Sequence, residues 1–286
     1  MEIKSIFLYI FLVQTIIHGG NFAIAQYSFG PTTQDFRCRN TGKFKGTNYE
    51  ENRNTALGRL VQKIRTPSYY GYCYASEDAA GKGDRVNAFA LCPPNVKGEG
   101  CEECIKKTIP YIKEKCPKQK EAVAWSIISN LYTCMVLYTD RDITAHGLDD
   151  WVWTSFSTPI ADANVAELQK ALNSLAPKMQ EEAAPSNNFF TKFAKGSVRY
   201  GSTTLYMSMQ CTPFLLKDDC IACLSKATKE IHKCCTGKRF ISGMAVSPYC
   251  VLRYAHDIFY PVSSPNIYSR LSSSATSGTH LSICIS

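Results

Sequence analysis

Two Cys-x-x-Cys pairs are the residues of this chain best spaced for chemistry. They are Cys101 with Cys104 and Cys220 with Cys223, each at the expected start of a helix. Such a pair could be a redox dithiol, because a helix N-terminus lowers thiol pKa, or half of a four-cysteine zinc site. In an oxidising compartment the same cysteines form structural disulfides instead. A third cysteine nine positions before each pair argues against the redox interpretation, and the 119 residues between the two pairs argue against a shared zinc site.

Other catalytic signatures are absent from the sequence. It has no Gly-x-Ser-x-Gly elbow, no His-Glu-x-x-His motif and no glycine loop for phosphate. The histidines after the first 25 residues are expected on the surface or in loops: His146, His232, His256 and His280. The acidic pairs Glu102/Glu103 and Asp218/Asp219 lie near helix starts, where carboxylates favour the helix dipole, so we expect capping rather than a glycosidase pair. We therefore predict a binding protein without cofactor or metal, and not an enzyme.

A long internal repeat contains both cysteine pairs. The spacing C-x8-C-x2-C-x11-C occurs twice, 119 residues apart, beginning at Cys92 and at Cys211. Three matched spacings in a row indicate two copies of one domain. We place the first domain at 27–145, the second at 150–262, and a Ser-rich tail that we expect to be disordered at 263–286.

The two copies share one order of expected elements. Each has an amphipathic helix, a strand that leads into the first cysteine, a helix through the Cys-x-x-Cys pair and a closing strand. The first helix and the two strands are expected at 57–64, 86–91 and 133–139, and at 165–175, 204–209 and 245–254. Pro110 should shorten or kink the first copy's cysteine-bearing helix. This order predicts an α+β fold with an antiparallel sheet.

The N-terminus has the pattern of a secretory leader. An apolar run is followed by Ala23-Ile24-Ala25, which a signal peptidase can cleave, so we expect residues 1–25 to be removed before Gln26. A membrane anchor is the alternative, but polar residues break the run before it reaches about 20 residues. Fourteen cysteines in 286 residues also indicate an oxidising compartment. We predict secretion to the extracellular space without a membrane anchor.

The charge of the chain favours anionic partners. Thirty-two Lys and Arg against 24 Asp and Glu give a net charge of +8. Such an excess suits wall polymers, phospholipid surfaces or acidic proteins, although it can also serve solubility alone. The partner expected here is an extracellular protein or an anionic wall polymer, with a microbial glycan as the alternative and no nucleic acid.

The doubled C-x8-C-x2-C core behind a leader resembles the plant cysteine-rich repeat secretory proteins, whose module is the ginkbilobin-homologous or stress-antifungal domain. Residues 194–196, 234–238 and 247–254 carry further similarity, and the resemblance covers about 35–260. It implies two domains, each with a five-stranded antiparallel sheet and two helices, stapled by disulfides. It also implies an apoplastic protein of stress or plant defence. Because the sequence contains no kinase and no later membrane span, it resembles the free secreted form, with a truncated receptor as the alternative.

The resemblance also implies a disulfide map. The implied pairs are Cys38–Cys116, Cys92–Cys101, Cys104–Cys134, Cys211–Cys220 and Cys223–Cys250. The remaining cysteines are Cys73, Cys234, Cys235 and Cys284. At least one of these four is expected to be a free thiol or to pair outside the family pattern, and Cys284 in the tail is the first candidate.

Mannose-binding members of that family use an Asn directly after the first cysteine, an Arg six residues before the last and a Glu five residues after it. The first copy has Arg39, Ile128 and Thr139 at these places, and the second has Met244 and Ala255. None keeps the family's residue type. The sequence suggests no carboxylate or amide beside Arg39, so we do not expect mannose binding in this mode.

Clustered aromatic residues are the other carbohydrate signal. They are Trp151 and Trp153 at the start of the second copy and Tyr69, Tyr70, Tyr72 and Tyr74 in the first. Trp at a domain junction more often packs between modules than it binds sugar, so we expect packing. Two functions follow: a secreted defence protein acting through a protein or wall-polymer partner, which we favour, and a lectin-type antifungal. A thiol-dependent enzyme ranks third.

Overall fold

The structure is a computed structural model that includes both cysteine repeats. It describes residues 33–65, 71–79, 84–94, 96, 98–128, 132–143, 152–156, 159–160, 165–184, 192–234, 239–240 and 242–260. Some sequence predictions lie outside these residues: the leader 1–25, the tail 263–286, and Tyr69, Tyr70, His146, Trp151, Cys235, His280 and Cys284.

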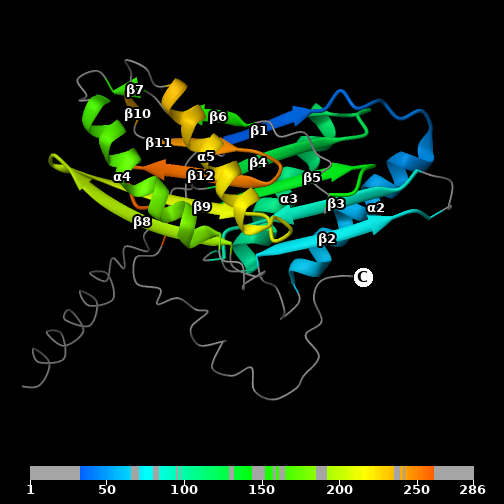
Figure 1. Ribbon diagram of the computed structural model, residues 1–286. Helices are drawn as coiled ribbons and strands as arrows, with labels where there is room; N and C mark the ends of the chain where they lie inside the picture. The colour runs from blue at the N-terminus through cyan, green and yellow to red at the C-terminus, as the bar shows by residue number, and fades with distance from the viewer. Residues whose placement is uncertain are drawn as a thin grey trace, which may run out of the picture. The chain divides into compact units, whose positions relative to one another are not determined.

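The first lobe is a five-stranded antiparallel sheet with two helices (Figure 1). Its elements are β1 (Thr33–Cys38), α2 (Thr47–Ile64), β2 (Tyr72–Glu77), β3 (Val86–Leu91), α3 (Gly98–Lys115), β4 (Ala122–Ile128) and β5 (Tyr132–Thr139). The strand order is β1-β4-β5-β3-β2, so the cysteine-rich segment between β3 and β4 crosses the sheet as a helix.

The second lobe repeats this architecture, with strand order β6-β11-β12-β9-β8 and a short added pair, β7 with β10. Its elements are β6 (Trp153–Phe156), β7 (Pro159–Ile160), α4 (Val165–Ala183), β8 (Phe193–Tyr200), β9 (Thr203–Cys211), α5 (Lys217–Cys234), β10 (Arg239–Phe240), β11 (Ser242–Val246) and β12 (Cys250–Ala255). The predicted α+β class with two disulfide-stapled sheets is therefore confirmed.

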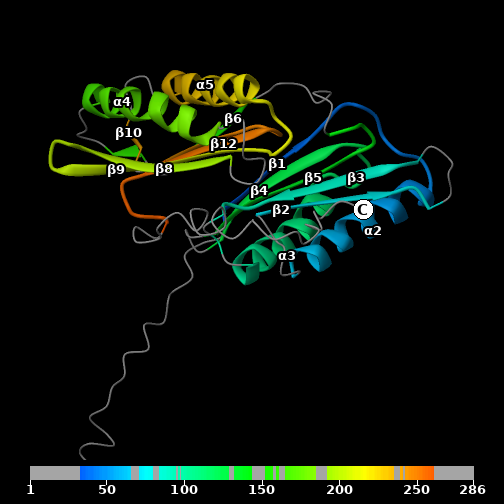
Figure 2. The same ribbon diagram turned by 60° about the horizontal axis from the view of Figure 1, so that its bottom comes forward.

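Each lobe has its helices on one face of its sheet (Figure 2). Leu57, Leu60 and Ile64 follow one side of α2 at helical spacing and are at most 2% exposed. They pack against the sheet together with Ile105 and Ile112 of α3. Burying these apolar stripes against the sheet is the main force that holds the helices in place.

The other face of the first sheet is buried against the second lobe. Along β5, Val136 and Tyr138 pack beneath α2 and α3. Met135 and Leu137 alternate with them and join a core that includes second-lobe residues, as the twofold period of a strand requires. The rings of Phe89 and Phe214 meet across this boundary with centroids 5.0 Å apart. The two sheets therefore share a continuous apolar junction.

Two sequence expectations about element boundaries were wrong. The expectation that Pro110 shortens its helix was wrong, since α3 continues to Lys115 with its apolar face buried against the sheet; the alternative, a kink, stays a prediction. The closing strand expected at 245–254 is two strands, β11 and β12, which pair antiparallel. The Ser247 hydroxyl makes the turn between them by accepting the backbone N–H of Tyr249 and Cys250, at 3.0 and 2.9 Å.

Candidate functional site

Five disulfides occupy the positions where thiol or metal chemistry was possible. They are Cys38–Cys116, Cys92–Cys101, Cys104–Cys134, Cys211–Cys220 and Cys223–Cys250, the same pairs that the resemblance implies. Neither Cys-x-x-Cys pair is bonded to itself, and each of its sulfurs is oxidised with a different partner. No thiolate is left at these four positions for redox or zinc chemistry. Of the other cysteines, Cys73 is fully buried in β2, and the Cys234 side chain lies outside the described atoms.

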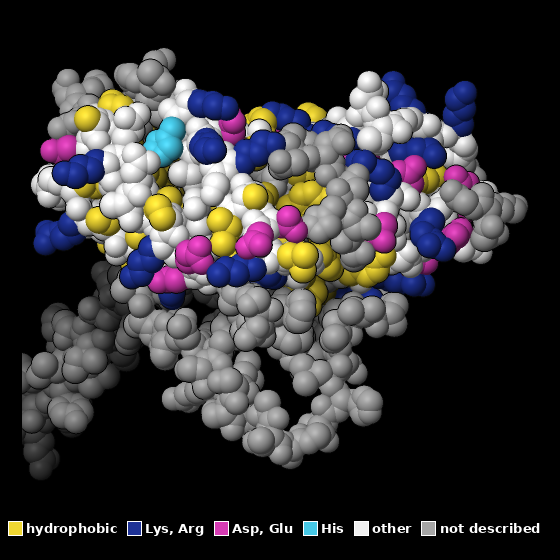
Figure 3. Space-filling model, viewed as in Figure 1, with side chains coloured by type: hydrophobic (Ala, Val, Ile, Leu, Met, Phe, Trp, Pro, Cys, Tyr) yellow, Lys and Arg dark blue, Asp and Glu magenta, His cyan; other side chains and the backbone are white. Residues whose placement is uncertain are grey.

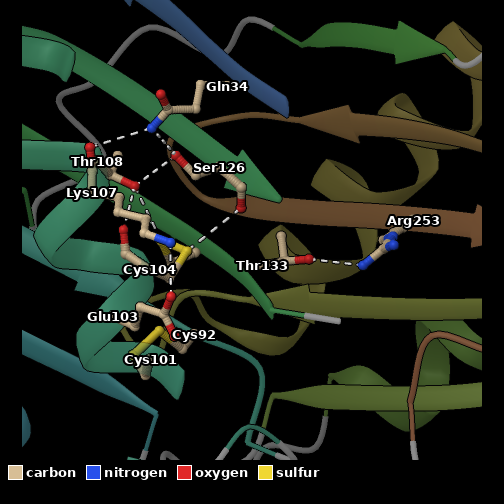
Figure 4. Close-up of a disulfide and its surroundings, with 11 residues drawn as sticks. Gln34, Cys92, Cys101, Glu103, Cys104, Lys107, Thr108, Ser126, Thr133 and Arg253 are labelled. Carbon is tan, nitrogen blue, oxygen red and sulfur yellow. Dashed lines mark hydrogen bonds and ion pairs between the residues drawn. A yellow bond between two sulfur atoms is a disulfide. The ribbon is translucent and has the colours of Figure 1, made fainter. Parts of the chain in front are cut away.

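Hydroxyl groups surround the Cys104–Cys134 disulfide (Figure 4). The Thr108 hydroxyl contacts the Cys104 carbonyl at 2.8 Å, the Ser126 hydroxyl at 2.6 Å and the Cys134 sulfur at 3.3 Å. The Gln34 amide donates to Ser126 at 3.0 Å. This network joins β1, α3, β4 and β5 and satisfies the buried polar groups. Its role is therefore structural.

A cluster of charged residues lies where the first copy has its family sugar positions. The Glu121 side chain, 1% exposed, accepts hydrogen bonds from the Thr139 hydroxyl at 3.2 Å and from Arg141 Nε at 2.9 Å. Its other oxygen is 3.4 Å from Arg39 Nε. Asn87 extends the network by donating to the Arg141 carbonyl at 2.8 Å. The expectation that no carboxylate joins Arg39 was wrong.

Strand register explains this correction. Ile128, chosen by counting back from the last cysteine, pairs with Tyr132 at the far end of β4. Glu121 directly precedes the opposite end of β4. Because Ala122 pairs with Tyr138, Glu121 lies beside Thr139. Counting along the sequence could not find Glu121.

The second copy has lost the polar character of these positions. Met244 pairs with Arg253, and Ala255 pairs with Ser242. Met244 and Ala255 are 4% and 6% exposed, and Ala255 packs with Phe259 and Tyr260. These positions of the second lobe are therefore apolar packing surface.

A basic edge lies beside the Glu121 cluster. We define it as residues 39–45 and 113–120, which carry seven Lys or Arg and one Glu, a net charge of +6. The Cys38–Cys116 disulfide and an antiparallel bridge between Lys43 and Gln119 hold the two segments together. Figure 3 shows Lys and Arg side chains projecting at this end of the first lobe. Glu121 and Asp140 pair with Arg39 and Lys120 at this edge, so the local excess is +6 less two charges, or +4.

Aromatic and cationic groups meet at the junction of the lobes. Trp153 stacks on Trp125 with ring centroids 6.4 Å apart, and the Arg37 guanidinium lies 4.8 Å from the Trp153 ring. The prediction that Trp153 packs between modules is confirmed.

Arg253 donates to the Thr133 hydroxyl across the junction at 3.0 Å (Figure 4), and burial lowers its pKa to about 10. A cavity of about 30 Å³ beside it has room for about two waters, which is too small for a sugar ring.

One of the two acidic pairs differs from expectation. Helix α3 begins at Gly98, so Glu102 and Glu103 lie past its first turn, and they form surface ion pairs instead of caps. Arg65 and Lys106 lower the pKa of Glu102 to about 2. Asp218 and Asp219 do lie in the first turn of α5. His232 lies within α5 and is half-buried, so it is not a loop residue; His256 follows β12 and contacts the Tyr200 hydroxyl at 2.6 Å.

The described residues contain neither a metal-binding cluster nor a membrane-spanning helix. No three His, Cys, Asp or Glu side chains among them are grouped to hold a metal ion. None of their helices has both the length and the apolar character needed to cross a bilayer.

Comparison with known proteins gives matches over most of the chain. The sequence profile described as salt stress response/antifungal matches residues 37–141 and 157–257. In Arabidopsis thaliana, cysteine-rich repeat secretory protein 38 is 25% identical, with 72% of this chain and 76% of that protein covered. Cysteine-rich receptor-like protein kinase 11 is 29% identical over 82% of this chain, which spans about a third (34%) of its length. The tandem DUF26 ectodomain of the Arabidopsis receptor-like protein PDLP8 has the same fold, with a TM-score of 0.60, 18% identity, and 78% of this chain and 98% of that one covered.

Proposed function

The chain belongs to the salt stress response/antifungal family, in tandem form, and on that premise we propose that it is an apoplastic binding protein that acts through a protein or wall-polymer partner. The family is stress- and defence-related, and its relatives include secretory proteins. The chain is an extracellular protein, and its five disulfides suit an oxidising compartment.

The basic edge is the observation that carries the proposal. It concentrates positive charge at an exposed end of a rigid, disulfide-bonded lobe, where Lys43, Lys45 and Lys118 are exposed. A surface of this kind attracts anionic macromolecules by long-range electrostatics and needs no deep pocket. The cysteines where thiol catalysis was possible are oxidised, which supports a binding role over a thiol-dependent enzyme.

A pull-down from plant extracellular fluid, run beside a glycan array, tests the proposed function. The immobilised full-length secreted protein is expected to retain an extracellular protein or a wall polymer reproducibly. A variant with Lys43, Lys45 and Lys118 changed to Gln should retain less. If neither experiment gives a specific partner, the proposed function fails.

A lectin-type antifungal is the second candidate, and the Glu121 cluster is the observation that favours it. Arg39, Glu121 and Thr139 place donors and acceptors at the family's sugar position. Their hydrogen-bonding groups are already engaged with one another, so we expect no mannose binding there. Titration calorimetry with mannose and yeast mannan is the measurement. Saturable binding that is lost in Thr139→Ala but kept in Ala255→Ser would establish the lectin instead.

A further inference from the structure

We infer that the basic edge is a binding surface for a linear polyuronide, a polymer with a carboxylate on each sugar ring. The inference rests on the proposed function and names the chemical class of its polymer partner. The edge contributes seven cations, and among the described ion pairs only Arg39, Lys115 and Lys120 of these seven take part. The others are available to an external anion.

Two of the lysines are held in place by rings beneath them. Phe44 and Tyr49 stack with centroids 5.0 Å apart and are 4% and 2% exposed. The Lys118 ammonium lies 5.4 Å from the Phe44 ring, and the Lys120 ammonium lies 5.9 Å from the Tyr49 ring. Cation–π contact orients both ammonium groups, which lowers the entropy cost of binding an anion. Lys120 also pairs with Asp140 at 3.4 Å, whereas Lys118 takes part in none of the described ion pairs.

The backbone arranges the cations as a row. Residues 42–44 run antiparallel to 118–120: the Lys120 N–H donates to the Gly42 carbonyl at 3.0 Å, and the Phe44 N–H donates to the Lys118 carbonyl at 2.9 Å. Lys118 and Lys120 are two positions apart, about 7 Å along an extended strand. A row of charges at such spacing matches a linear polyanion better than a single small anion.

The same edge argues against the other occupants. A neutral glycan needs exposed aromatic faces or free hydrogen-bonding groups, but the Phe44 and Tyr49 rings are buried and Glu121 is engaged. Insertion into a lipid surface needs apolar side chains, yet the large exposed ones in the described chain are Leu216 and Ile258, both in the second lobe. Protein interface cores are depleted of Lys. A carboxylated polysaccharide remains as the partner that fits.

Binding of de-esterified polygalacturonate to the full-length secreted protein, measured by biolayer interferometry, tests the inference. The affinity should fall by about tenfold or more between about 0.02 and about 0.5 M salt, because exposed charges are screened. The triple variant Lys43→Gln, Lys45→Gln, Lys118→Gln should lose about tenfold at low salt. Near-UV circular dichroism checks that the variant keeps its fold.

A matched control changes the same number of charges elsewhere. Lys170→Gln, Lys178→Gln, Lys229→Gln removes three exposed cations from α4 and α5 and should keep the affinity within about twofold. Equal losses in the two triples would show a net-charge effect and overturn the inference. So would equal binding to methyl-esterified polygalacturonate, to polyaspartate or to phosphatidylserine vesicles. If polygalacturonate does not bind but the pull-down retains another extracellular partner, only this inference fails; if neither binds, the proposed function fails too.

Discussion

Glu121 is held between two guanidinium groups and one hydroxyl at the end of the first sheet. The carboxylate is buried, whereas the side chains of Arg39 and Arg141 are 19% and 31% exposed. Removing this carboxylate is costly, because the two guanidinium groups would stay partly desolvated without a negative charge to compensate them. At the scale of single residues, this cluster is therefore expected to stabilise the end of the sheet.

The substitution Glu121→Gln tests this role. It should lower the free energy of unfolding by about 1–3 kcal/mol, because the buried network loses its negative charge and an NH2 donor replaces one of the two acceptor oxygens. Urea unfolding followed by circular dichroism is the measurement. The control is Glu114→Gln, whose side chain is 71% exposed and pairs with Lys115 on the surface, and little change is expected there. Equal small effects in both variants would show that the cluster does not stabilise the fold.

At the scale of elements, the disulfides of the first lobe differ in what they connect. Cys92–Cys101 links the end of β3 to the start of α3 over a sequence separation of 9 residues. Cys104–Cys134 links α3 to β5 over 30 residues, and Cys38–Cys116 links β1 to the end of α3 over 78 residues. In the chain-entropy description, stabilisation grows with the length of the closed loop. The longest bridge also holds the basic edge together.

Replacing each pair with two alanines should reveal this order. The expected losses are about 4.5 kcal/mol for Cys38–Cys116, about 3.6 for Cys104–Cys134 and about 2.6 for Cys92–Cys101, measured by urea unfolding. Peptide mapping without reduction should recover the same pairs from the secreted protein. The order is contradicted if the nine-residue bridge proves the most stabilising. A peptide linking Cys101 to Cys104 would contradict the pairing itself.

His232 gives α5 a pH-sensitive position. Its Nε2 atom is buried and has no hydrogen-bond partner among the described residues, and burial lowers its pKa below 6.5. Between the folded pKa and about pH 6.5, the unfolded chain binds more protons than the folded one. The stability that neutral His232 contributes is therefore full above about pH 6.5 and is lost as the pH falls through the folded pKa. We expect His232→Gln to lose less thermal stability than the parent between pH 7.5 and pH 5. Identical slopes of Tm against pH would disprove the role.

The elements were more predictable from sequence than the site. Cysteine spacing and apolar periodicity were enough for the α+β class, because they are local patterns. The register that places Glu121 beside Thr139 comes from the pairing of β4 with β5, which cysteine spacing does not encode. The burial of β3 on both faces did leave a signal, since 86–91 is a nearly continuous apolar run. The four lysines between 113 and 120 can be read from the sequence. The basic edge could not be predicted, because it depends on a long-range contact between this segment and 39–45.

At the scale of the whole molecule, processing of the N-terminus remains a prediction. The pattern Ala23-Ile24-Ala25 leads us to expect that the protein in extracellular fluid begins at Gln26. N-terminal sequencing of the secreted protein is the measurement. A product that begins at Met1, or one that fractionates with integral membranes, would contradict it.

The apolar junction should make the two lobes unfold together. Trp153 contributes a half-buried ring that stacks on Trp125 and lies under Arg37, so Trp153→Ala should cost about 1–3 kcal/mol, less than a fully buried Trp. Because this loss falls on the contact between the lobes, we expect one calorimetric transition in the parent protein and two in the variant.

Tyr111→Ala is the matched control: Tyr111 is also half-buried, but it packs edge-on against Phe36 within the first lobe, with centroids 5.8 Å apart. It should lower Tm and leave a single transition. Two transitions in the parent, or one unshifted transition in Trp153→Ala, would mean that the junction does not couple the lobes.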